Sequence, residues 1–328
     1  MVDPNIQLTP QIEHTSITNE EAELFRQAQD FLKASKSENT LTAYKSDWKC
    51  FSSWCAARNK DSLPATAITV TLYITDLANK GMKVSTLSRR ISAITKAHRL
   101  ANCADIPTKT EEFREFFKGV KNTLRCEQNK KKALLTGDIQ TIIHMIPDRL
   151  IGVRDKAIFL VGFAGGFRRS EIAALDVEDI EFREEGMIVT IRNSKTDQEG
   201  QGARVGIHYG NREKTCPVRA LQTWLEVSET LSGPVFRYVD RHENIREGRL
   251  NALSITRIVK RCVERADLDP KDYGGHSLRA GLVTTAALND APISSIMKQT
   301  RHSSFDTVRG YIREGQIFKK NVSAMLGL

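Results

Sequence analysis

The sequence lacks the cysteine spacings that mark zinc sites and disulfide frameworks. Its six cysteines include no C-x-x-C pair and have no histidines at zinc-ligand spacing. They are Cys50, Cys55, Cys103, Cys126, Cys216 and Cys262. The close pair, Cys50 and Cys55, belongs to one predicted helix. We therefore predict reduced, mostly packed thiols and no metal site.

Long apolar runs are also missing. No segment approaches the roughly eighteen consecutive apolar residues that a membrane-spanning helix needs. Residues 1–14 are acidic and polar, without the basic flank and apolar core of a targeting segment. The sequence therefore predicts a cytoplasmic protein with no membrane partner. In a bacterium it would be associated with the nucleoid, and if a phage or plasmid encodes it, it would act in the host cell.

Two common signatures of phosphate chemistry are absent as well. The sequence contains no Gly-x-x-x-x-Gly-Lys loop to hold nucleotide phosphates and no clustered carboxylates suited to two-metal nuclease chemistry. Nucleotide hydrolysis and metal-dependent strand cleavage are therefore disfavoured, and no cofactor is expected. With 328 residues, the chain is long enough to form two domains.

Positive charge is concentrated in one part of the chain. Residues 1–30 contain one basic and six acidic side chains, whereas residues 31–135 contain twenty basic and nine acidic ones, a net charge of +11. The remaining residues contain 28 basic and 25 acidic side chains. A basic excess confined to one region is typical of proteins that bind nucleic acid. A lysine-rich, solvated surface is the alternative, and charge alone does not decide between the two.

Helical periodicity indicates a first domain at residues 31–124. The acidic residues 1–30 before it are predicted to be a flexible tail. From Ser37 onward, apolar residues recur at spacings of three and four. Further amphipathic segments follow at Ala67–Lys80, Lys83–Ala101 and Lys109–Thr123. The pattern predicts a small bundle of four or so helices.

One segment of this bundle combines short hydroxyl side chains with cations. The residues that we expect to contact DNA are Lys83, Ser85, Thr86, Arg89, Arg90, Lys96 and Arg99. Such a mixture suits a helix that lies along a phosphate backbone or in the major groove. An ordinary solvent-exposed helix face is the alternative.

The second domain, residues 136–328, follows a polar, cationic linker at 125–135. Its first helix is predicted to be capped at Thr136 or Asp138 and to end at Pro147. Further helices are predicted at Asp155–Phe163, Ser170–Leu175, Pro217–Leu231 and Leu253–Ala266, and the rest of the chain after the sheet is predicted to be helical. Three strands, Glu178–Phe182, Met187–Arg192 and Arg204–His208, are predicted to form a small antiparallel sheet. The fold class is therefore mainly α with a small β-sheet.

Four features of the second domain form an ordered set. They are Arg168 in Gly-Phe-Arg-Arg-Ser-Glu, Lys195 in the loop of the β-hairpin, His276 and Arg279 in His-Ser-Leu-Arg, and His302 followed nine residues later by Tyr311. Each feature is weak by itself. Together and in this order they resemble the tyrosine recombinase (phage integrase) family. Its members have an arginine in a Gly-x-Arg-x-Ser-Glu turn, a hairpin lysine, a His-x-x-Arg pair, a histidine or tryptophan, and a tyrosine nine residues further on.

The resemblance implies a helical core-binding domain and a mixed α/β catalytic domain that form a C-shaped clamp on DNA. It implies that Tyr311 is the nucleophile that forms a 3′-phosphotyrosine. Arg168 and Arg279 would bind the non-bridging phosphate oxygens through forked hydrogen bonds. Arg169 competes with Arg168 for this role, and we favour Arg168 because it directly follows Gly-Phe.

The remaining roles concern proton transfer and orientation. The resemblance implies that Lys195 protonates the leaving 5′-oxygen and that His276 is the general acid/base near Tyr311. His302 would donate a hydrogen bond to a non-bridging oxygen, and the two histidines could partly exchange roles. Glu171 is expected to orient an arginine or a histidine without reacting itself.

Two departures from the commonest family pattern stand out. Ala280-Gly281 replaces the usual histidine-threonine after Arg279, and Thr300-Arg301 replaces the usual Leu-Gly before His302. Both departures, together with Tyr311-Ile312-Arg313, favour the Cre-like branch of the family.

The resemblance also implies an assembly. We expect a monomer in solution and a homotetramer on a double-stranded DNA site with inverted repeats, which acts through a Holliday junction. An apolar stripe on a terminal helix is expected to dock in a neighbouring subunit; its residues are Ile317, Phe318, Val322, Met325 and Leu326. A type IB topoisomerase that relaxes DNA and a catalytically idle DNA-binding regulator are the alternative functions.

Overall fold

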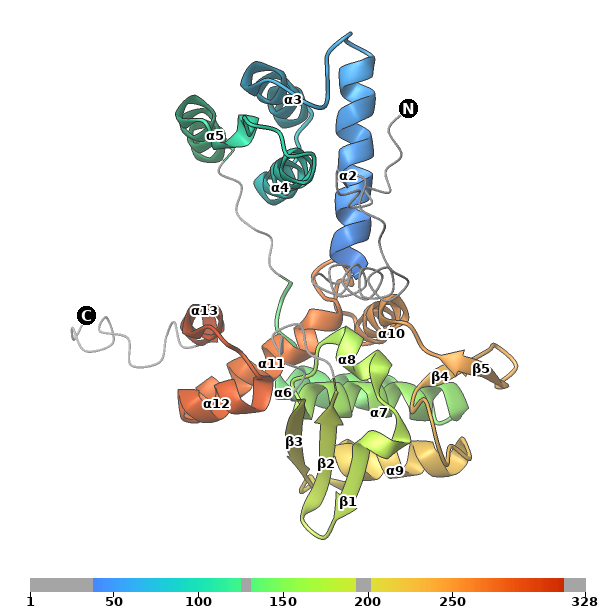
Figure 1. Cartoon of the computed structure of the whole chain (residues 1–328). Coiled ribbons are helices and arrows are strands. Elements are labelled where there is room, and N and C mark those ends of the chain that lie inside the picture. Colours follow the sequence, from blue (N-terminus) through green and yellow to red (C-terminus); the bar gives the residue numbers. More distant parts are fainter. Residues whose placement is uncertain (1–37, 125–130, 193–201, 316–328) are drawn as a thin grey trace, which may run out of the picture. The chain divides into compact units, whose positions relative to one another are not determined.

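A computed structural model describes residues 38–124, 131–192 and 202–315. The chain divides into two compact units between Gln128 and Asn129 (Figure 1). This boundary lies inside the predicted linker. The predicted acidic tail, the loop residue Lys195 and the terminal apolar stripe fall outside the described residues.

The first unit is a bundle of helices around one apolar core. Its elements are α2 (Glu38–Ala56), α3 (Ala67–Asn79), α4 (Val84–Leu100), a 3₁₀ turn η1 (Pro107–Lys109) and α5 (Glu111–Thr123). Each helix lies within one or two residues of the position that periodicity predicted. Two of them begin at a threonine that accepts a hydrogen bond from the first turn: Thr66 caps α3 and Thr110 caps α5. Phe51, Tyr73 and Leu87 are fully or almost fully buried in the core.

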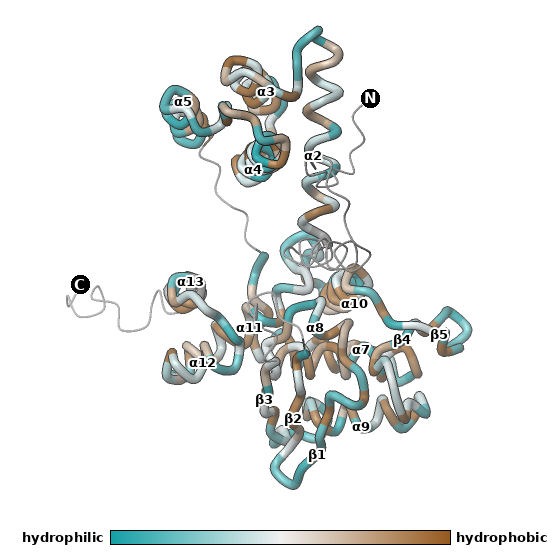
Figure 2. Tube along the Cα trace, viewed as in Figure 1, coloured by the Kyte–Doolittle hydropathy of each residue, from teal (hydrophilic) through white to brown (hydrophobic). Residues whose placement is uncertain are grey.

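The second unit contains the remaining helices, one three-stranded sheet and one two-stranded sheet. Its helices are α6 (Thr136–Met145), α7 (Leu150–Ala164), α8 (Arg169–Ala174), α9 (Pro217–Val227), α10 (Ala252–Arg265), α11 (Gly275–Leu288), α12 (Ile293–Thr300) and α13 (Phe305–Gly315). Short 3₁₀ turns η2 (Val177–Asp179) and η3 (Glu213–Thr215) precede β1 (Ile180–Arg183) and α9. Apolar residues are concentrated on α7 and β2 (Gly186–Ile191) (Figure 2). Helix α7 is buried along most of its length and packs against α9 and α11.

The three-stranded sheet is antiparallel, in the order β1–β2–β3. Its strands are β1 (Ile180–Arg183), β2 (Gly186–Ile191) and β3 (Ala203–His208). The prediction of this sheet is confirmed, although Glu178 lies in η2 and not in the first strand. Ile191 pairs with Ala203, so both ends of the loop that contains Lys195 are fixed by the sheet.

A second hairpin contradicts the prediction that the chain beyond the first sheet is wholly helical. Strands β4 (Arg237–Val239) and β5 (Ile245–Arg249) pair antiparallel. Their sequence is highly charged and lacks the alternation of apolar residues that would have indicated strands. Polar contacts made in the folded state hold the hairpin. Arg249 binds Asp176, and Asp240 accepts hydrogen bonds from the turn residues His242 and Asn244.

Several helix ends also differ from the prediction. Helix α9 ends at Val227 and not at Leu231, and α7 begins five residues earlier than expected. The first residue before α6 is Leu135, and Asp138 accepts the hydrogen bond from its backbone N–H. Thr136 therefore lies inside the helix, and Asp138 caps it from the third position.

Helix α11 packs closely against the segment before α6 because it contains Gly281. A Cβ atom at Gly281 would lie 1.9 Å from the backbone oxygen of Leu134, and 3.1 Å from the ring of Phe163. The Leu134 backbone also donates a hydrogen bond to the carbonyl of Ser277 on the same helix. Gly281 thus lets the segment before α6 lie against α11, and this contact accounts for one departure from the family pattern.

Replacing Gly281 by alanine should destabilise the second unit by about 1–3 kcal/mol, because the added methyl group meets backbone that cannot easily move. The control is Gly206→Ala on β3, where a Cβ atom would have no atom within 4 Å. This change should alter stability by no more than about 0.5 kcal/mol. Differential scanning calorimetry of both variants of the full chain measures the effects. Equal midpoints for the two variants would contradict the close approach at Gly281.

Candidate active site

Arg168 is fixed at the start of α8 by a carboxylate one turn further on. Its backbone N–H donates to Glu171 Oε2 at 2.8 Å, and its Nη1 donates to Glu171 Oε1 at 2.7 Å. A carboxylate in the first turn that accepts from the backbone N–H of the residue before the helix is a usual way to satisfy a free N–H group at a helix start. It leaves the Arg168 side chain 21% exposed and anchored on one edge.

A second arginine, which the sequence did not assign to the site, binds the same carboxylate. Arg301 Nη2 donates to Glu171 Oε2 at 2.6 Å, and the Arg301 guanidinium lies over the ring of Phe167, 5.2 Å from its centroid. The Glu171 side chain is almost fully buried. Burial by itself would raise its pKa, but Arg301 and Arg168 outweigh this effect and lower the pKa below the usual 4.5. Glu171 is therefore ionised and shared.

Arg279 lies on α11 and is 1% exposed. Its Nη1 donates to the carbonyl of Gly166 at 2.7 Å, where the chain turns with φ +57° between α7 and α8. A Cβ atom at Gly166 would meet Leu282 at 2.7 Å, so only glycine fits this turn. The Arg279 Nη2 atom is buried and makes no hydrogen bond within the described parts of the chain. Burial, followed by the positive charge of Arg168, lowers the pKa of Arg279 to about 9.

His302 lies beside Arg279 in a neutral form. The Thr300 hydroxyl donates its one proton to the carbonyl of Ile296, so it accepts from His302 Nδ1 at 2.6 Å. His302 Nε2 then accepts from Arg279 Nε at 3.4 Å. Burial and the nearby Arg279 lower the pKa of His302 to about 4. Without DNA, His302 Nε2 is therefore an acceptor, whereas the sequence led us to expect a donor to phosphate at this residue.

His276 and Tyr311 meet directly. His276 Nε2 lies 2.5 Å from the Tyr311 hydroxyl, and the two rings are tilted with centroids 6.0 Å apart. Helix α13 packs on α11 through a small apolar cluster that includes Val308, one turn before Tyr311. Loss of solvent around His276, then Arg279 and Arg168, lower its pKa from 6.5. His276 is therefore neutral at neutral pH and can accept the phenolic proton.

The cluster as a whole has an excess of positive charge. Arg168, Arg279 and Arg301 surround one ionised carboxylate, Glu171, and the two histidines with lowered pKa are neutral. Three guanidinium charges and one carboxylate leave two positive charges among these groups. Mutual repulsion of closely packed cations is unfavourable, so a bound anion would stabilise them. The arrangement suits a phosphate group.

The structure thus brings together five of the six predicted catalytic residues, and the sixth, Lys195, lies outside the described residues. Strand β3, which follows its loop, contacts α12, because Gln299 donates to the carbonyl of Gly206 at 3.1 Å. Gln299 also donates to the carbonyl of Ala164 at the end of α7, at 3.0 Å. Arg169 points elsewhere: its Nη1 donates to Thr256 on α10 at 3.1 Å. The geometry therefore favours Arg168 over Arg169 as the arginine of the site.

Residues of the predicted DNA-binding helix α4 divide between two faces. One face is exposed along the whole helix and consists of Ser85, Arg89, Ser92, Lys96 and Arg99, with Lys83 exposed just before it. The opposite face packs into the bundle through Leu87, Ile94 and His98. His98 is satisfied in the core, since it contacts the carbonyl of Ile94 and accepts from the backbone N–H of Ala65.

Arg90 differs from the other predicted DNA contacts. Its side chain is 14% exposed, binds the Tyr73 hydroxyl and faces the buried Asp47. Asp47 also binds Arg89 at 3.0 Å. In this structure the Arg90 guanidinium binds groups in the core of the bundle. Thr86 is half-buried. The sequence pattern did not predict the inward position of Arg90, because it does not show which face of a helix packs against a partly polar core.

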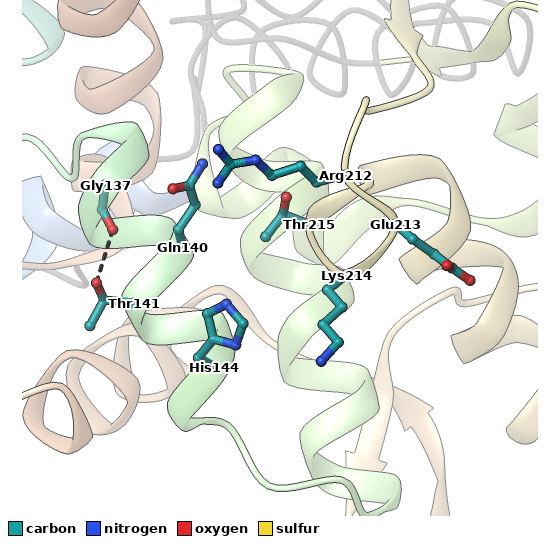
Figure 3. Close-up of a pocket in the computed structure, with 8 residues that line it drawn as sticks. All are labelled: Gly137, Gln140, Thr141, His144, Arg212, Glu213, Lys214 and Thr215. Carbon is teal, nitrogen blue, oxygen red and sulfur yellow. Dashed lines mark hydrogen bonds between the residues drawn. The ribbon is translucent and has the colours of Figure 1, made fainter.

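A pocket in the second unit lies between α6 and η3 (Figure 3). Its lining is polar and shares no residue with the cluster around Glu171; the residues are Gly137, Gln140, Thr141, His144, Arg212, Glu213, Lys214 and Thr215. In the close-up, the labelled side chains of Arg212, Lys214 and Glu213 do not converge on one point, so these charged residues do not form one catalytic or binding site in this pocket.

Comparison with known proteins supplies the family. Residues 132–316 match the model of the phage integrase family, and residues 29–102 match that of the phage integrase N-terminal SAM-like domain. The chain belongs to the phage integrase family. It is 38% identical over 313 residues to an integrase/recombinase XerD homolog of Selenomonas ruminantium, an alignment that covers 94% of this chain and 91% of the relative.

More distant relatives and solved structures agree. A tyrosine recombinase XerC of Myxococcus xanthus is 30% identical over 194 residues, which cover 55% of this chain and 57% of the relative. The fold is similar to that of the Tn1549 transposon integrase in complex with transposon right end DNA, with a TM-score of 0.63 and 12% identity; the match covers 87% of this chain and 92% of the integrase chain. XerH recombinase bound to a palindromic difH substrate gives a TM-score of 0.62 at 14% identity, and the match covers 92% of this chain and 83% of the XerH chain.

These findings confirm the fold class and the family that the motifs indicated. The relatives from Selenomonas ruminantium and Myxococcus xanthus are both of the Xer type, so membership of the Cre-like branch stays a prediction. Within the described ranges, no helix is both long and apolar enough to cross a membrane.

Glu171→Gln tests the shared carboxylate through stability. At neutral pH the variant should lose about 3 kcal/mol, because the nearly buried Arg301 and the partly buried Arg168 keep their charge without its counterion. Since the folded-state pKa of Glu171 is lowered, its contribution is full above pH 4.5 and is lost as pH falls through the lowered value. The difference in urea midpoint between wild type and variant should therefore shrink below pH 4.5. A difference that stays constant across the acid range would contradict this assignment.

Proposed function

We propose that this chain is a site-specific DNA recombinase that cleaves and rejoins strands through a 3′-phosphotyrosine on Tyr311. The observation that supports this proposal best is the 2.5 Å contact between the Tyr311 hydroxyl and His276, beside a cluster of arginines with an excess of positive charge. A nucleophile next to its base, next to an anion site, is the arrangement that phosphoryl transfer needs.

The cation cluster would act on the scissile phosphate. Attack by a phenolate on a phosphodiester builds a pentacoordinate phosphorane with one more negative charge than the starting diester. Arg168 is partly exposed on a fixed anchor, and the buried Nη2 of Arg279 lacks a partner in the described residues. These two groups can bind the non-bridging oxygens, and a phosphate would reach Arg279 once the side chains over it move aside.

The proton of the nucleophile would pass to His276. A phenol with a pKa of about 10 is roughly one thousandth ionised at neutral pH, so a base must accept its proton as the O–P bond forms. His276 is neutral and in contact, and it becomes the acid that returns the proton when the strand is resealed. The leaving 5′-oxygen takes its proton from Lys195 in this proposal, and the phosphotyrosine conserves the energy of the broken bond.

DNA would bind along both units. The exposed stripe on α4 that contains Arg89, Lys96 and Arg99 supplies cations along one helix face, which suits contacts to a phosphate backbone. Two solved structures of similar fold contain DNA, which supports a double-stranded DNA partner. The remaining features, a clamp around a site with inverted repeats, a homotetramer and a Holliday junction, follow from the family resemblance.

Two other functions use the same fold. A type IB topoisomerase has the same tyrosine chemistry but relaxes DNA without a specific site, and a regulator would bind DNA without cleaving it. The contact between Tyr311 and His276 favours a catalytic protein over a regulator, and the XerD homolog, which matches nearly the whole chain, favours recombination over relaxation.

Tyr311→Phe should abolish covalent attachment to DNA while leaving DNA affinity intact, because the change removes only the nucleophilic oxygen. The assay uses a pool of nicked duplexes with randomised sequence, from which adducts are recovered on denaturing gels. Sequencing of the adducts that wild type forms identifies the preferred site. Survival of adducts in the variant would refute the nucleophile. Wild-type adducts without sequence preference, accompanied by relaxation of any supercoiled plasmid, would instead indicate a topoisomerase.

The pH dependence of cleavage should follow His276. At subsaturating DNA, the apparent second-order rate reports groups of the free enzyme. Because the base form of His276 is required and burial lowers its pKa, the acid limb of the rate should be centred below pH 6.5. His276→Gln should remove this acid limb as well as most of the rate. An acid limb centred above pH 6.5 would count against His276 as the base.

A further inference from the structure

Arg301 occupies a position that, in the family pattern, usually holds glycine. The residue directly follows α12 and has φ +55°, the left-handed region that glycine adopts most easily. Its backbone N–H donates to the carbonyl of Met297, and the N–H of His302 donates to the same carbonyl at 3.2 Å. The turn therefore directs His302 back toward the site, and glycine would perform this task with less strain.

The side chain at this strained position is buried in a specific environment. It is 9% exposed, its Nη2 contacts Glu171 at 2.6 Å, and its guanidinium covers the Phe167 ring. Burial lowers the pKa of Arg301, and Glu171 opposes that effect. A cation that is desolvated at a strained backbone position needs a compensating interaction, and the contact with Glu171 supplies it.

Glu171 connects Arg301 to Arg168, the arginine that would bind the phosphate in the proposed function. One carboxylate oxygen accepts from Arg168 Nη1, and the other accepts from Arg301 and from the Arg168 backbone N–H. The carboxylate is thus held from two sides, and its plane fixes the direction of the Arg168 fork. If Arg301 were absent, Glu171 would lose the guanidinium that holds it on one side, and it could turn together with Arg168.

We propose that Arg301 is a positioning residue for strand cleavage, which acts through Glu171 to orient the Arg168 guanidinium toward the scissile phosphate. This role rests on the proposed function. Arg301 does not touch the reacting atoms. It also reduces the negative charge that Glu171 presents to Arg168, so that more of the Arg168 charge remains for the phosphate.

Arg301→Gly is the decisive variant, because glycine adopts the left-handed turn without strain while the change removes the whole side chain, including the guanidinium. The single-turnover rate of adduct formation on the nicked duplex selected by wild type should fall by about 10- to 100-fold, as for other residues that orient a catalytic group. DNA affinity in a gel-shift assay should stay within about twofold. Arg301→Lys restores charge without the planar fork and should recover part of the rate.

Asp267→Gly is the matched control. Asp267 is exposed, follows α10 and has φ +56°, so its replacement relaxes the same backbone strain outside the site. Its cleavage rate should equal that of wild type. A slow Arg301→Gly variant beside a normal control assigns the loss to the Arg301 side chain and not to the relaxed backbone, and recovery in Arg301→Lys assigns part of that loss to the positive charge.

A double variant shows whether Arg301 acts through Glu171. If it does, adding Arg301→Gly to Glu171→Gln should cost little beyond the loss of Glu171→Gln alone. Losses that multiply, or a wild-type rate in both Arg301→Gly and Arg301→Lys, would overturn the proposal. Wild type serves as the reference throughout: if it forms no adduct, the proposed recombinase function has failed, whereas adducts with unaffected Arg301 variants refute only the positioning role.

Discussion

The candidate active site depends on one buried carboxylate, Glu171. Glu171 lies among three arginines whose charges repel one another, and it binds two of them directly. The cost of gathering cations away from water shows in the lowered pKa of Arg279 and of Arg301. Glu171 offsets part of this cost but not all of it. The net positive charge that remains would be stabilised by a bound anion. In the proposed function, the positive charge that remains is available to bind a phosphate.

Burial and the same excess of positive charge keep the histidines neutral. Loss of solvent around His276 and His302, and then the cations near them, disfavour protonation, so both rings are neutral before DNA arrives. A neutral ring at Tyr311 is a base that is ready to accept a proton. In the proposed mechanism, the negative charge of an entering phosphate would favour protonated histidine, which is the form that follows once the tyrosine has given up its proton. Binding of the anion and proton transfer would then favour each other.

The motif residues were predictable because their chemistry is tied to their order along the chain. Arg168, Arg279 and Tyr311 stand in short patterns whose residue types follow from phosphoryl transfer, and a common spacing links His302 to Tyr311. Helices such as α3 and α4 were predictable because an apolar stripe repeats with the helical period. The β4–β5 hairpin was missed because ion pairs with distant residues, such as Arg249 with Asp176, hold it, and no local pattern records them. Arg301 was visible as a departure from the family pattern, but its partner lies 130 positions earlier.

The sequence by itself determined the family and the fold class and predicted the reacting groups, because these depend on local periodicity and on residue types in a fixed order. Tertiary structure decided which of those groups meet. It placed His276 against Tyr311, turned Arg90 toward the core of its bundle and joined Arg168 to Arg301 through Glu171. The reason is physical: burial and contact arise between segments far apart in the chain, and pKa shifts and ion pairs depend on those distances and not on sequence spacing.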